Sequence, residues 1–145
     1  MGKILCATRG GEASYRTQDA TIALAQERGD EILFLYVIDI EFLKVARAVR
    51  PDVVTAEMEK MGEFLLAMAQ ERAQKQGVQA DYVLRHGDMR QELIAAAREM
   101  DVALVVLGKP TGEESAFAMA GLESFAAKIE AETGVETRII GGALD

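Results

Sequence analysis

The sequence has little of the chemistry that marks secreted, metal-binding or membrane proteins. It contains one cysteine, Cys6, so it cannot form an intramolecular disulfide and gives no sign of an oxidising compartment. Its one histidine, His86, has no neighbouring cysteines or carboxylates at the spacing of metal ligands. No apolar run approaches the roughly 20 residues that span a bilayer, and the opening letters MGKILCATRGG do not form a signal peptide. We therefore expect a cytoplasmic location and no membrane partner.

Basic residues are also scarce relative to acidic ones. The chain has 16 lysines and arginines against 24 aspartates and glutamates, a formal net charge of −8. The long-range field repels the phosphates of nucleic acids and anionic membrane surfaces, so we expect neither as a partner. A length of 145 residues, half of them hydrophobic, suits one domain, residues 1–145, with one substantial core.

What the sequence does contain is an alternation of short apolar runs and helical patterns. The apolar runs predict strands at Lys3–Thr8, Glu31–Asp39, Ala80–His86, Val102–Gly108 and Glu136–Gly142. Helices are expected between them, from Ser14 to Arg28, from Pro51 to Gln76, from Asp88 onward, and through Leu122, Phe125 and Ile129 to Gly134. Nearly unbroken apolar runs are typical of strands covered on both faces. The pattern predicts an α/β fold, a doubly wound parallel sheet with helices on both faces.

The second expected helix carries large apolar residues at helical spacing: Val54, Met58, Met61, Leu65 and Met68. Methionine fills irregular gaps in cores, so we interpret this row as the face packed on the sheet rather than as a ligand site. The preceding segment, residues 41–50, is a short helix or a loop. Its three cations are interpreted as solvated surface.

Two loops follow strands at the edge of the sheet where α/β proteins bind ligands. The first, Thr8–Ser14, has Gly10 and Gly11, whose backbone can approach a ligand closely, and Arg9, whose planar fork suits phosphate. The second, Gly108–Ser124, offers Lys109, Thr111 and Ser115. The alternative is structural: a tight turn at the two glycines, with Arg9 paired to a carboxylate. The second loop lacks the Gly-Lys-Ser/Thr ending of a Walker A motif.

No catalytic constellation is evident. His86 stands at a strand end without a nucleophile partner, and Cys6 lies in an apolar run, where we expect a buried, inert thiol. Enzymatic activity is therefore expected to be absent, or at most slow nucleotide hydrolysis.

The order of these segments resembles the universal stress protein family over nearly the whole chain. KILCATRGGEAS resembles the family's first strand and loop, and ILFLYVID its second strand. The most specific match is VLRHGDMRQELIAAAREMDVALVVLG, residues 83–108, which resembles the family's strand, Gly-Asp turn, helix and apolar strand closing on glycine. The resemblance implies five parallel strands in the order 3-2-1-4-5 and a homodimer joined through the last strand, TRII.

Many family members bind ATP through Gly-x2-Gly-x9-Gly-Ser/Thr after the fourth strand, and this sequence departs from that motif. Three residues, not two, separate Gly108 from Gly112, and Leu122 follows Gly121 where a hydroxyl is expected. In a second register Ser124 supplies the hydroxyl, but Glu123 replaces the glycine before it. Arg9 also stands where ATP-binding members have an aspartate. It either holds phosphate itself or fills the pocket by pairing with a carboxylate.

Two functions follow from the resemblance. The first is a regulatory protein that binds ATP or another adenine nucleotide, with Mg²⁺ if so, and the second is a member that binds no nucleotide and acts through dimerisation or a protein partner. For the first, the expected binding residues are Thr8, Arg9, Gly10, Gly11, Ile38, Gly108, Lys109, Thr111, Gly112, Gly121 and Ser124. We expect no catalytic and no metal-binding residues.

Overall fold

A computed structural model describes residues 2–8, 12–39, 50–109 and 115–140 of the chain. These residues form five strands and four helices. In chain order they are β1 (Lys3–Ala7), α1 (Glu12–Arg28), β2 (Glu31–Ile38), α3 (Pro51–Lys75), β3 (Ala80–His86), α4 (Met89–Glu99), β4 (Leu104–Gly108), α5 (Ser115–Thr133) and β5 (Glu136–Ile140). Most observed bounds lie within two residues of the sequence prediction, but α5 begins at Ser115, inside the segment Gly108–Ser124 that the sequence predicts to be a loop. Residues 141 and 142 of the last predicted strand lie outside the described residues.

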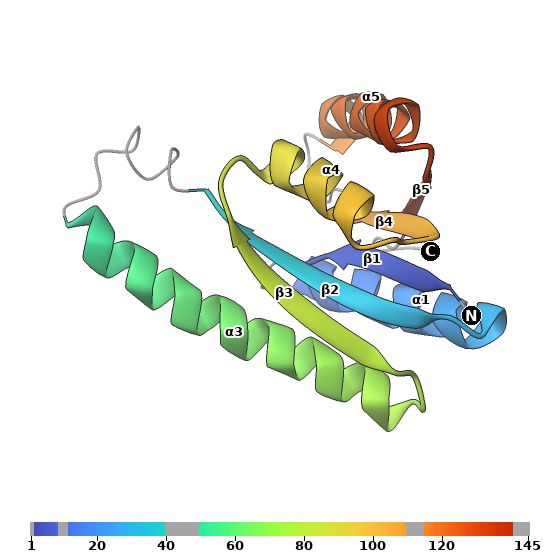
Figure 1. Ribbon diagram of the computed structural model, residues 1–145, viewed down its shortest axis with the longest axis horizontal. Helices are drawn as coiled ribbons and strands as arrows, with labels where there is room; N and C mark the ends of the chain where they lie inside the picture. The colour runs from blue at the N-terminus through green and yellow to red at the C-terminus, as the bar shows by residue number, and fades with distance from the viewer. Residues whose placement is uncertain (1, 9–11, 40–49, 110–114, 141–145) are drawn as a thin grey trace.

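The strands form one parallel sheet in the order β3-β2-β1-β4-β5, which confirms the predicted order. Figure 1 shows α1 and α3 on one face and α4 and α5 on the other. Along β1, Ile4 and Cys6 join the core beneath α1 and α3, whereas Leu5 joins the core beneath α4 and α5. Because β1 is buried on both faces, its residues do not alternate between apolar and polar. This explains the unbroken apolar run.

The ends of the helices follow local sequence signals. Asp88 caps α4 by accepting a hydrogen bond from the backbone N–H of Gln91 at 3.0 Å, as the spacing of these two residues predicts. Gly29, Gly77 and Gly134 follow the ends of α1, α3 and α5 and take positive φ angles of 71°, 77° and 73°. A residue with a Cβ is strained in this left-handed conformation, which explains why glycine ends these helices.

The face of α3 that packs on the sheet is not the predicted one. Its buried residues are Gly62, Leu66, Ala69 and Ala73, and the first three each lie one position after a member of the predicted row. Met61 is instead 57% exposed, and the rest of that row is half-buried. A Cβ on Gly62 would lie only 2.9 Å from side-chain atoms of Leu84 and Tyr36. The helix therefore approaches the strands closely at Gly62, Leu66 is the large side chain of its buried face, and the predicted row lies on the flank.

Cys6 is fully buried at the centre of the sheet. Burial raises the pKa of its thiol to about 11, while a hydrogen bond from the Thr21 hydroxyl, 3.6 Å from Sγ, acts in the opposite direction. A thiol of this kind stays protonated near neutral pH, as expected for an inert core cysteine. Within the described ranges, no helix combines the length and apolar character needed to cross a bilayer.

Candidate functional site

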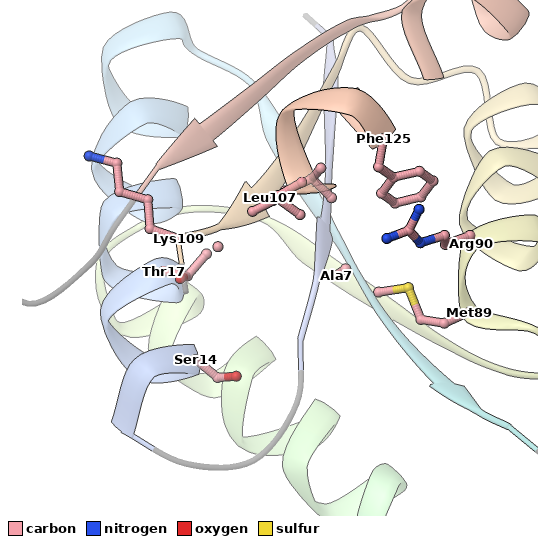
Figure 2. Close-up of a pocket in the computed structure, with 10 residues that line it drawn as sticks. Ala7, Ser14, Thr17, Met89, Arg90, Leu107, Lys109 and Phe125 are labelled. Atoms are coloured by element: carbon pink, nitrogen blue, oxygen red, sulfur yellow. The ribbon is translucent and has the colours of Figure 1, made fainter. Parts of the chain in front are cut away.

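A crevice of about 320 Å³ opens at the carboxyl ends of β1 and β4. These two strands are neighbours, and the connections from them run to opposite sides of the sheet, so the crevice lies at the topological switch point. Figure 2 shows the side chains that surround it. They come from both strands and from three helices: Ala7, Ser14, Thr17, Met89, Arg90, Leu107, Gly108, Lys109, Leu122 and Phe125.

The floor of the crevice depends on close packing between β4 and α1. A Cβ on Gly108 would lie 2.6 Å from the Thr17 hydroxyl oxygen, closer than non-bonded atoms approach. Glycine at this position therefore lets α1 lie against the strand end. The following residue, Lys109, donates its backbone N–H to the carbonyl of Ile140 at 3.1 Å. This bond extends the pairing of β4 with β5 one residue further and fixes the backbone from which the Lys109 side chain projects.

The opposite wall is formed where α4 meets α5. Met89 and Arg90 come from the first turn of α4, and Leu122 and Phe125 come from α5. Phe125 is 3% exposed, and the guanidinium carbon of Arg90 lies 4.9 Å from the centre of its ring. This distance is within the range of a cation–π contact. The wall is therefore apolar at its base and cationic at its rim.

The charged side chains in the described lining of the crevice are both cations, although the chain as a whole is acidic. The described lining contains the cations Arg90 and Lys109 and the hydroxyls of Ser14 and Thr17, and neither an aspartate nor a glutamate. The chain as a whole carries a formal charge of −8. A positive, partly enclosed region on an acidic protein attracts an anion to that region.

Among the predicted binding residues that the structure describes, Gly108 and Lys109 line the crevice. Thr8 lies at the end of β1, 4% exposed, and its hydroxyl accepts a hydrogen bond from Gln18 Nε2 at 2.6 Å. Ile38 is the last residue of β2 and is fully buried. Gly121 and Ser124 are interior residues of α5, half-buried and exposed respectively, and neither is among the lining residues. Arg9, Gly10, Gly11, Thr111 and Gly112 lie outside the described residues.

Sequence reasoning did not identify Thr17, Met89, Arg90, Leu122 or Phe125 as site residues. For most of them nothing in the sequence separates a lining residue from an ordinary core position. Arg90 is different, because it is a cation in the first turn of α4. The positive end of the helix dipole disfavours a cation there, so this placement is a signal that the sequence does contain.

Neither of the other reactive side chains belongs to the crevice. Cys6 is in the core, and the Nε2 atom of His86 lies 3.1 Å from Oε1 of Glu59, which links the end of β3 to α3. In the described part of the chain, no group of three or more His, Cys, Asp or Glu side chains could hold a metal ion.

Comparison with known proteins identifies one family. The model of the universal stress protein family matches residues 1–135. Universal stress protein YxiE of Bacillus subtilis (strain 168) is 31% identical over 116 residues, which cover 74% of this chain and 78% of the relative. The chain therefore belongs to the universal stress protein family, as the resemblance of its motifs predicts.

Solved structures agree on the fold. A member of the universal stress protein family from Burkholderia pseudomallei superposes with a TM-score of 0.73 at 22% identity, covering 97% of this chain and 96% of that one. A universal stress protein solved in complex with cAMP superposes with a TM-score of 0.71 at 20% identity, covering 98% of each chain. At these identities the likeness concerns the fold.

Proposed function

We propose that this universal stress protein binds an adenine nucleotide in the crevice between β1 and β4. The observation that carries the proposal is the combination of a cavity of about 320 Å³ with a described lining that contains two cations and no carboxylate. Pockets for small ligands start at about this size and combine apolar walls with a few polar groups. The complex of a related fold with cAMP supports the choice of an adenine nucleotide among anionic ligands.

The lining fits such a ligand in two respects. Ala7, Leu107 and Leu122 offer an apolar surface for a base and ribose. The hydroxyls of Ser14 and Thr17 and the guanidinium of Arg90 offer donors for phosphate oxygens, and Lys109 adds positive charge to the lining. If Mg²⁺ accompanies the nucleotide, phosphate oxygens of the ligand would supply part of its coordination.

The direct test is to purify the protein, denature it, and look for released adenine nucleotide by mass spectrometry. Calorimetric titrations with ATP, with and without Mg²⁺, and with AMP then measure affinity. Replacing Lys109 with Ala should weaken binding by up to roughly tenfold, since one of the two positive charges of the described lining is lost. Lys128→Ala is the matched control, because Lys128 is exposed on α5 outside the crevice and its loss changes the net charge equally. Absence of both released and titrated nucleotide at millimolar concentrations would remove the proposal.

The second candidate is a member that acts through protein contacts without nucleotide. The exposed apolar side chains of α3 favour it, since Met61 and Phe64 are 57% and 62% exposed. A negative result in the nucleotide titrations together with self-association would support this candidate. The cytoplasmic location predicted from the sequence stays a prediction.

We also propose that the homodimer forms through β5, which is an edge strand of the sheet. Backbone groups of alternate residues in a strand point to opposite sides. Because the carbonyl of Ile140 accepts from Lys109, on the β4 side, the backbone groups of Ile139 face the free edge.

Replacing Ile139 with Pro removes an edge donor, whereas Ile139→Val keeps it. Light scattering during size exclusion should give twice the 15.7 kDa chain mass for the parent protein and Ile139→Val, and a monomer for Ile139→Pro. A monomeric parent protein would contradict the dimer.

A further inference from the structure

Most arginines described in the structure are neutralised by the protein itself. A carboxylate oxygen lies within 4 Å of the guanidinium of each of five: Arg28, Arg50, Arg72, Arg85 and Arg138. Arg98, near the end of α4, donates to the backbone carbonyl of Glu132 at 3.1 Å. These contacts are expected on a chain with 24 acidic and 16 basic residues, where carboxylates are abundant.

Arg90 has a different environment. Its contact is with the face of the Phe125 ring, 4.9 Å from the guanidinium carbon, and no carboxylate among the described residues lies within ion-pair distance. Arg72 makes a similar contact with the Tyr15 ring, at 5.0 Å, but its guanidinium also pairs with Asp19. The guanidinium of Arg90 carries five N–H donors that no carboxylate of the described residues pairs with. In Figure 2 the guanidinium lies beside Phe125, on the wall of the crevice opposite Ser14 and Lys109.

The position of Arg90 also has an electrostatic cost. It belongs to the first turn of α4, where the partial positive charge of the helix end repels a cation. An anion bound beside Arg90 would be attracted by the guanidinium. The same crevice wall therefore provides a forked donor and an aromatic contact beside a phosphate group, at a helix end that the Asp88 carboxylate already caps.

We propose that Arg90 recognises the phosphate of the ligand, so that the crevice selects nucleotides over nucleosides. This inference rests on the proposed function for the identity of the ligand. It adds a specificity residue on α4, outside the two glycine loops. Phe125 is a positioning residue, since its ring contacts the guanidinium rather than the ligand phosphate.

The test compares AMP with adenosine by calorimetry on the parent protein, Arg90→Met, Arg90→Lys and Arg98→Met. Methionine keeps an unbranched apolar stem against Phe125 and removes the donors. Arg90→Met should weaken AMP binding roughly 10- to 100-fold and leave adenosine binding unchanged. Arg90→Lys should restore part of the loss, because it keeps the charge and loses the fork. Arg98→Met removes the same charge from the same helix and should behave like the parent protein.

A second measurement separates failure of this inference from failure of the proposed function. Thermal unfolding is followed with millimolar pyrophosphate, a probe that carries the phosphate chemistry without a nucleoside. Pyrophosphate should raise the melting temperature of the parent protein and of Arg98→Met, and not that of Arg90→Met.

Each pattern of results decides the matter. If Arg90→Met weakens AMP and adenosine equally, or affects neither, phosphate recognition by Arg90 is overturned while nucleotide binding stands. If the parent protein binds neither AMP nor adenosine but shows Arg90-dependent stabilisation by pyrophosphate, the proposed function fails and Arg90 remains an anion-binding residue. If pyrophosphate also has no effect, both are overturned.

Discussion

Arg85 and Arg90 lie on the two sides of the turn that enters α4, and the protein uses them in opposite ways. Arg85, on β3, bonds Glu92 Oε1 at 2.8 Å and Glu99 Oε2 at 2.9 Å, and its side chain is 20% exposed. The hydrogen bonds to Glu99 and Glu92 raise the pKa of this guanidinium above its ordinary value. Arg90 instead rests on Phe125 at the rim of the crevice. Arg72 shows that the aromatic contact is not the deciding feature, since it lies over the Tyr15 ring at 5.0 Å and is also paired with Asp19. What distinguishes Arg90 is that no carboxylate of the described residues pairs with it.

Removing the packing that supports both arginines should have the largest effect. Leu93 is fully buried where α4 contacts the sheet. Leu93→Ala deletes buried carbon atoms and leaves a cavity, so it should lower the free energy of unfolding by about 2–5 kcal/mol. Urea denaturation measures the change. Val53→Ala on α3, where the parent side chain is 46% exposed, is the control and should change stability by less than about 0.5 kcal/mol. Similar costs for the two variants would contradict the assignment of Leu93 to the core.

A substitution in the turn between the two arginines should have the next largest effect on stability. Gly87 has a φ of 139°, a conformation strained for any residue with a side chain. A Cβ added there would also lie 3.0 Å from Oε2 of Glu92, the partner of Arg85. Gly87→Ala should cost about 1–3 kcal/mol by denaturation. Gly134→Asn is a useful control, because asparagine tolerates the left-handed conformation and there a Cβ would meet nothing within 4 Å. If both substitutions cost the same, neither the backbone conformation of Gly87 nor its contact with Glu92 contributes.

Much of this arrangement was predictable from the sequence, for identifiable reasons. Unbroken apolar runs located the strands, because a parallel sheet is covered on both faces, and Asp88 marked the start of α4 by its capping spacing. The strand order came from the family resemblance. The face of α3 was predicted wrongly because periodicity identifies a stripe of large apolar residues, whereas contact with the sheet at Gly62 requires a small one. Arg90 was missed because its partner, Phe125, belongs to another helix and meets it only in the folded chain.

The same substitution at the two arginines compares them directly. Arg85→Met removes hydrogen bonds to two carboxylates and should destabilise the protein by about 1–2 kcal/mol, a reduced value because Glu99 is 58% exposed and screened by solvent. Arg90→Met loses no hydrogen bond within the described protein and should change stability by less than about 0.5 kcal/mol. Denaturation at low and high salt checks this, and the cost at Arg85 should shrink at high salt. Equal costs would mean that Arg90 is a structural residue.

The smallest effect is expected for a paired charge at the other end of the sheet, and it depends on pH. Asp30 accepts hydrogen bonds from Arg28 Nε and from the backbone N–H of Gly2, both at 2.8 Å. The bond from Arg28, and then that from Gly2, lower the pKa of this carboxyl below its ordinary value. A lowered pKa in the folded state means that the unfolded chain takes up the proton first as the pH falls. The stabilisation is therefore complete above the ordinary carboxyl pKa of about 4 and is lost as the pH falls through the pKa of Asp30 in the folded protein.

Asp30→Asn should cost less than about 1 kcal/mol of unfolding free energy at pH 7, and the difference from the parent protein should disappear in acid. A difference that persists unchanged below the carboxyl range would show that Asp30 acts through packing rather than through its charge.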